Sequence, residues 1–81
     1  MMTTEEIEAK LRAAFPDAHL QVVDTTGTMD HFEALVVSSA FEGKTRVQRH
    51  QAVYAALGDA MRERIHALAL TTLTPDQYGS P

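Results

Sequence analysis

The chain contains no cysteine. It therefore cannot form a disulfide bond, and by itself it cannot build a metal site from thiolates. Any metal ligands that it supplies must be histidine or carboxylate side chains. Glycine is scarce as well, and none of the four glycines belongs to a Gly-x-x-Gly sequence or a glycine-rich phosphate loop. The chain thus lacks the loop with which KH domains hold a nucleic-acid backbone.

The chain also lacks long apolar runs and an excess of positive charge. Its longest apolar stretches are far shorter than a membrane span, and no secretory signal pattern opens the sequence. The formal net charge is −4. An acidic chain repels phosphate on average, which disfavours a nucleic-acid partner unless basic residues cluster locally. We expect a cytoplasmic protein that does not bind membranes.

The 81 residues are enough for one compact domain, and a hydrophobic content of 44% is ordinary for a folded protein. We assign residues 1–78 to a single domain and residues 79–81 to a flexible tail.

The first half of the chain predicts one helix and a hairpin. Residues 3–6 have the spacing of a helix-capping box, and Pro16 ends the helix that follows. Residues 20–24 and 32–37 are rich in β-branched and large apolar side chains, as strands are. The turn-rich residues 25–30 between them are a short connection, which favours antiparallel pairing.

The second half returns to a helical pattern at Thr45, and Gly58 is expected to break or bend that helix. Residues 65–73 predict a third strand, and residues 74–77 predict a capped final helical turn. The resulting order, α-β-β-α-(α)-β-α, indicates an α+β domain with a three-stranded mixed sheet and helices packed on one face.

Helical spacing also predicts which side chains are buried. On the long helix the predicted stripe comprises Val47, His50, Tyr54, Leu57 and Met61. For the whole domain we expect a core that includes Ile7, Leu11, Phe15, Val36, Val47, Tyr54 and Leu57.

Sequence signatures of an enzyme are absent. Ser38 and Ser39 end a predicted strand, and no motif pairs either hydroxyl with a base. The acidic residues are scattered over predicted helix faces, where solvated charge explains them. We therefore predict that the protein is not an enzyme.

Each of the four histidines has a structural interpretation beside a functional one. His19 is expected to be an exposed residue at a strand edge, and His50 a partly buried imidazole bonded to the backbone. His31 ends the loop before the central strand, and His66 begins the last strand. These two are interpreted either as a pair of metal ligands or as ordinary boundary residues.

Lys44, Arg46 and Arg49 form a local basic stretch at the start of the long helix. Three interpretations remain open for it: a solvated helix face, a nucleic-acid contact, or a docking surface for a protein partner.

Several segments together resemble the BolA family. They are Phe-Glu-Gly-Lys at 41–44, Val-Gln-Arg-His-Gln-Ala-Val-Tyr at 47–54 and Ile-His-Ala-Leu at 65–68, with further similarity at 32–39 and 73–78. The resemblance runs from about the first helix to the end of the chain. It implies a fold similar to class II KH domains.

The resemblance also implies partnership with a monothiol glutaredoxin that carries a CGFS motif. In such pairs a 2Fe–2S cluster bridges the two proteins, and the glutaredoxin side supplies a cysteine and a glutathione thiolate. His66 matches the family's ligand histidine, and the second ligand comes from the loop between the first two strands. That loop is short here and has Met29 in its middle. A thioether is a poor substitute for a thiolate, so the resemblance points to His31. The isolated chain is expected to hold no cluster.

The family resemblance carries one alternative, since some BolA-like proteins are discussed as transcription regulators. In that interpretation Lys44, Arg46 and Arg49 would contact DNA.

Overall fold

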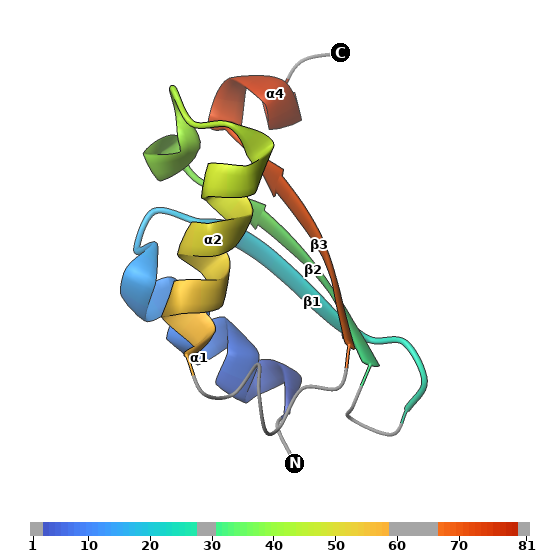
Figure 1. The fold of residues 1–81 in the computed structure, drawn as a ribbon. Coiled ribbons are helices and arrows are strands. Elements are labelled where there is room, and N and C mark those ends of the chain that lie inside the picture. Colours follow the sequence, from blue (N-terminus) through green and yellow to red (C-terminus); the bar gives the residue numbers. More distant parts are fainter. Residues whose placement is uncertain (1–2, 28–30, 59–66, 80–81) are drawn as a thin grey trace.

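The computed structural model describes residues 3–27, 31–58 and 67–79. Along the chain the elements are α1 (Thr4–Ala14), β1 (His19–Asp24), β2 (His31–Val37), a 3-10 turn (Ser39–Phe41), α2 (Arg46–Leu57), β3 (Ala67–Leu73) and α4 (Pro75–Gly79) (Figure 1). The predicted order of helices and strands is confirmed. The additional helix written in parentheses falls between α2 and β3, in residues 59–66, which lie outside the described residues.

Local sequence signals set the ends of the helices. The Thr3 side chain accepts a hydrogen bond from the backbone N–H of Glu6 and caps α1, which ends just before Pro16. A capping box at Thr45 begins α2, and Gly58 ends that helix with a positive φ of 58°. A second capping box begins α4, with hydrogen bonds in both directions between Thr74 and Gln77.

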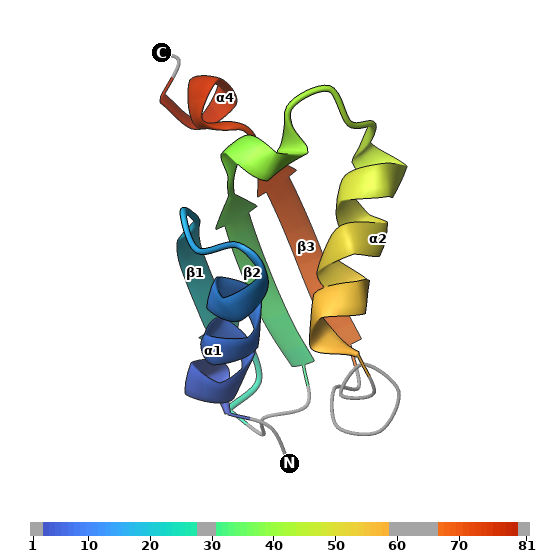
Figure 2. The ribbon, with the colours of Figure 1, turned by 90° about the vertical axis from the view of Figure 1, so that its left-hand side faces the viewer.

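The three strands form one sheet in the order β1-β2-β3. β1 and β2 pair antiparallel, as a hairpin requires, whereas β2 and β3 pair parallel because α2 crosses between them. Figure 2 shows α1 and α2 on the same face of the sheet, with α1 over β1 and β2 and α2 beside β3. The prediction of a mixed sheet with helices on one face is confirmed.

The core lies between this face and the two helices. Alternate strand residues point toward it, so the burial of the strands has a period of two. The buried cluster comprises Ile7, Leu11, Phe15, Ala18, Phe32, Val36, Phe41, Val53 and Leu57.

The predicted buried stripe on α2 is wrong in part. Leu57 is buried, but Val47 is 65% exposed and Tyr54 is 40% exposed, whereas Val53 is fully buried. The buried side of α2 is rotated toward Val53 because the small side chains of Ala52 and Ala56 let the helix approach the core there. Met61, the last member of the predicted stripe, lies outside the described residues.

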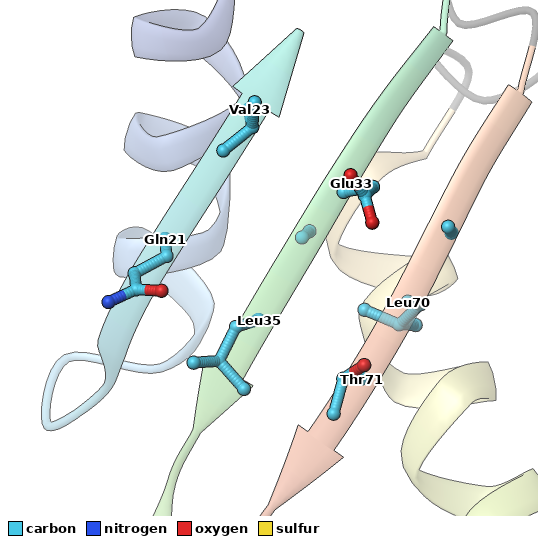
Figure 3. Close-up of a pocket in the computed structure, with 8 residues that line it drawn as sticks. Gln21, Val23, Glu33, Leu35, Leu70 and Thr71 are labelled. Atoms are coloured by element: carbon cyan, nitrogen blue, oxygen red, sulfur yellow. The ribbon is translucent and has the colours of Figure 1, made fainter. Parts of the chain in front are cut away.

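On the opposite face of the sheet Gln21, Val23 and Glu33 are exposed within the described part of the chain. A shallow pocket of about 390 Å³ lies on this face, lined by side chains from all three strands that include Gln21, Val23, Glu33, Leu35 and Thr71 (Figure 3). At one end α4 reaches this face, since the Tyr78 hydroxyl lies 3.2 Å from Nε2 of His19.

The C-terminal boundary differs from the predicted one. Gly79, expected in the tail, is the last residue of α4, and residues 80–81 lie outside the described part. Among the described helices, none is both long enough and apolar enough to cross a membrane.

Candidate functional site

His31 is the first residue of β2 rather than the last residue of the preceding loop. Its carbonyl oxygen accepts hydrogen bonds from Thr25, from the backbone N–H at 3.0 Å and from the hydroxyl at 3.1 Å. The backbone of this histidine is therefore anchored at the base of the loop. Strand alternation places its half-buried side chain on the face of the sheet away from α1 and α2.

The start of the loop between β1 and β2 is also ordered by hydrogen bonds. The Asp24 carboxylate accepts from the backbone N–H groups of Thr26 and Gly27, at 3.3 and 3.0 Å. Gly27 has a φ of 75°, which favours glycine at this position. The predicted turn is confirmed for these residues, whereas Met29 lies outside the described part.

The parallel register places His31 opposite Ala67, the first residue of β3. His66 precedes Ala67 in the sequence and itself lies outside the described residues. The sheet thus brings His31 beside the chain position that follows His66, although 36 positions separate His31 from Ala67 in the sequence. Within the three described ranges, no group of three or more histidine or carboxylate side chains could hold a metal ion.

The basic stretch lies at the other end of the sheet. Lys44, Arg46 and Arg49 line a groove of about 410 Å³ between the start of α2, the end of β3 and α4. The rise of a strand, about 3.3 Å per residue, puts the far end of β3 about 20 Å from the level of His31. The two candidate sites from the sequence are therefore separate.

Arg49 has a structural role in this groove. Its guanidinium donates hydrogen bonds to the carbonyl of Lys44 at 3.0 Å and to Oε1 of Gln77 at 2.9 Å, with a longer contact of 3.5 Å to the carbonyl of Thr72. These contacts connect α2 to β3 and α4. Lys44 and Arg46 are exposed, and neither side chain has a polar partner among the described residues.

The two remaining histidines, His19 and His50, each lie near a tyrosine ring. His19 is exposed on the edge strand β1, as predicted, and its ring lies 5.1 Å from the ring of Tyr78. His50 is half-buried, as expected, and its ring lies in a T-shaped arrangement with the ring of Tyr54, with 6.3 Å between the ring centroids. The expected backbone hydrogen bond of His50 is absent among the described residues.

Sequence reasoning missed a polar cluster at Asp17. This carboxylate accepts hydrogen bonds from the Ser38 hydroxyl at 2.8 Å and from both the backbone N–H and the hydroxyl of Ser39 at 2.9 and 2.8 Å. The hydrogen bonds from Ser39 and Ser38 lower the pKa of Asp17 below its usual value of 3.8. These hydrogen bonds connect the segment that follows α1 to the segment that follows β2.

Fold and site together define a small α+β domain with a mixed three-stranded sheet and two candidate sites toward opposite ends of that sheet. Residues 11–77 match the family model described as BolA-like protein. The chain belongs to the BolA family.

Relatives and solved structures agree with this assignment. The chain is 41% identical to the DNA-binding transcriptional regulator BolA of Escherichia coli, over 96% of this chain and 81% of that protein. It is 43% identical to the protein BOLA2 of Arabidopsis thaliana, over 100% of this chain and 88% of that protein. A bol-like protein from Babesia bovis has a similar structure, with a TM-score of 0.86 and 33% identity over 96% of this chain and 91% of that one.

Proposed function

We propose that this protein is a non-enzymatic partner of a monothiol CGFS glutaredoxin and shares a 2Fe–2S cluster with it for trafficking, assembly or iron sensing in the cytoplasm. On this side His31 and His66 are the cluster ligands. The glutaredoxin contributes a cysteine thiolate and bound glutathione, because this chain has no thiolate to offer.

The parallel register of β2 and β3 is the observation that most supports the proposal. His31 and Ala67 face each other across the ladder, and His66 directly precedes Ala67 in the sequence. The anchored carbonyl of His31 keeps its backbone in place when a partner approaches. Two imidazole ligands from this chain would suit a cluster completed by another protein, since they are too few for a site of their own.

Imidazole ligands would give the shared cluster particular properties. Histidine ligation raises the reduction potential of a 2Fe–2S cluster relative to all-cysteine ligation. It also makes binding sensitive to protons, because only neutral imidazole coordinates metal. Both properties suit a protein that releases or senses a cluster.

Co-expression with a CGFS glutaredoxin tests the proposal. We expect a coloured one-to-one heterodimer that contains iron and sulfide and has visible absorption and circular dichroism distinct from the glutaredoxin alone. A heterodimer without iron, or failure of the two proteins to associate in the presence of glutathione and iron, would contradict it.

Nucleic-acid binding is a second candidate function, favoured by the groove that Lys44, Arg46 and Arg49 line. The hydrogen bonds of Arg49 limit this candidate, because they leave Lys44 and Arg46 as the exposed cations. Two neutralised phosphates predict a slope of about −1.8 in log K against log salt on duplex DNA. DNA affinity measured at several salt concentrations tests this candidate, and a slope near zero or no binding would reject it.

A further inference from the structure

The groove at the start of α2 lies along an unpaired edge of the sheet. β3 is an outer strand of the described sheet, and Leu70 to Leu73 of this strand line the groove. Figure 2 shows α2 beside β3, on the side away from β1. The groove therefore borders the place where a fourth strand would lie.

The hydrogen bonds of β3 show which residues face this edge. The backbone N–H of Ser38, which follows β2, donates to the carbonyl of Leu73, so Leu73 faces β2. Alternate residues of a parallel strand direct their N–H and C=O groups to opposite sides, and Thr72 and Leu70 therefore face outward. The contact from Arg49 on α2 to the carbonyl of Thr72 agrees with this direction.

β3 lacks the charge, proline and bulge that protect many edge strands, although α2 lies beside it and Arg49 contacts the carbonyl of Thr72. Its sequence, Ala-Leu-Ala-Leu-Thr-Thr-Leu, contains no charge and no proline, and its register with β2 continues over seven residues without a bulge. Proteins usually protect long edge strands with such features, since the unpaired backbone groups otherwise bind another strand.

The flank of α2 beside the groove is apolar and cationic. Val47, His50 and Tyr54 lie on one side of the helix at three- and four-residue spacing, and His50 lines the groove. Val47 and Tyr54, both expected in the core from the sequence, are exposed in the structure. Lys44 and Arg46 add two exposed positive charges to a chain with a net charge of −4.

We propose that this groove binds an extended acidic segment of a partner protein, which pairs as a strand with Leu70 and Thr72. Its acidic side chains lie against Lys44 and Arg46, and its apolar side chains cover Val47 and Tyr54. Such strand addition obtains affinity from main-chain hydrogen bonds and specificity from the side-chain contacts.

A peptide fits the groove better than a nucleic acid for two reasons. The groove offers only two cations without protein partners in the described part, and the exposed apolar flank would remain uncovered by a phosphate backbone. Unpaired N–H and C=O groups of an edge strand complement a peptide backbone directly, and of the outward groups of Leu70 and Thr72 the Thr72 carbonyl alone has a partner in the described part, Arg49.

This proposal does not depend on the cluster function. The strand residues that line the groove, Leu70 to Leu73, lie about 10 to 20 Å from the level of His31, so the test uses the isolated full-length chain without metal or glutaredoxin. Failure of one proposal therefore leaves the other standing.

The test is a nuclear magnetic resonance titration of the ¹⁵N-labelled protein with an acetylated and amidated hexapeptide of alternating valine and glutamate. We expect saturable binding below about 1 mM, with amide hydrogen exchange slowed at Leu70 and Thr72 but unchanged at Thr71, which already bonds to β2. The Lys44→Glu, Arg46→Glu double variant should bind about tenfold more weakly, a change of about 1.4 kcal/mol. Lys10→Glu, an exposed change on α1, should bind as the wild type does.

Peptide backbone variants separate strand pairing from simple charge attraction. One hexapeptide is N-methylated at its odd-numbered residues and another at its even-numbered residues. Only the peptide that is methylated at the N–H groups facing β3 should lose binding. The proposal is overturned if the two methylated peptides bind equally, if an analogue with lysine in place of glutamate binds as tightly as the acidic peptide, or if no chemical-shift change occurs up to about 1 mM peptide. It is also overturned if a single-stranded oligonucleotide binds at this edge and the peptide does not.

Discussion

Two valines on α2 offer a direct test of which side of this helix is buried. Val53 is fully buried among core side chains, whereas Val47, six residues earlier, is 65% exposed. Val→Ala removes two carbons at either position. At Val53 the lost burial costs about 0.8 kcal/mol per carbon, or about 1.6 kcal/mol, and the cavity left behind adds to this cost.

Both substitutions also raise the helix propensity of α2, by about 0.5 kcal/mol. This gain is the same for both variants, so it cancels when Val53→Ala is compared with Val47→Ala. Val53→Ala should therefore lower the free energy of unfolding by about 1 to 2 kcal/mol, and Val47→Ala should leave it unchanged or raise it slightly. In a domain of this size the first change lowers Tm by about 5 to 15 °C.

Urea and thermal unfolding followed by circular dichroism measure both effects. Equal destabilisation by the two substitutions, or a larger loss for Val47→Ala, would refute the helix orientation described here. It would also remove the exposed apolar flank on which the proposed peptide groove depends.

Three further predictions concern the polar links and the isolated chain. Because the pKa of Asp17 is lowered in the folded state, its carboxylate stabilises the fold above the unfolded value of 3.8, and this stabilisation is lost as the pH falls through the lowered pKa. The stability difference between wild type and Asp17→Asn should therefore shrink below about pH 4 in urea titrations, and a constant difference would count against this role. Arg49→Met should speed amide exchange in α4 because it removes the bond to Gln77, whereas Lys44→Met should not; equal rates in both variants would argue against the link. The protein purified alone should be folded and colourless, and stoichiometric iron and sulfide in it would contradict the shared-cluster proposal.

Short-range sequence signals predicted the ends of most elements. Thr3, Pro16, Gly58 and the Thr74–Gln77 capping box act through hydrogen bonds or backbone angles within a few residues, so the sequence alone reveals them. The antiparallel pairing of β1 and β2 followed from their short connection.

The packing between helices and strands was harder to predict from the sequence. The periodicity of α2 is compatible with more than one buried stripe, and it favoured the larger side chains of Val47 and Tyr54. The actual orientation depends on close packing at Ala52 and Ala56, whose small side chains carry a weak hydrophobic signal. Periodicity within one helix cannot reveal what the neighbouring elements require.

The polar contacts between distant segments were not predictable either. Asp17 lies 21 and 22 positions from its two serine partners, and Arg49 lies 28 positions from Gln77. No local pattern marks such pairs. The pairing of His31 with Ala67 likewise needed the register of a parallel ladder, which a sequence pattern alone does not define.

The most direct test of the proposed function is the visible circular dichroism of the reconstituted heterodimer with a CGFS glutaredoxin. Four single variants are compared with the wild type: His31→Ala, His66→Ala, Met29→Ala and the matched histidine control His50→Ala. Loss of a ligand should change the cluster spectrum and speed cluster loss for His31→Ala and His66→Ala, while the other two variants keep the wild-type spectrum. A spectrum unchanged by both His31→Ala and His66→Ala, with the variants folded, would contradict the account.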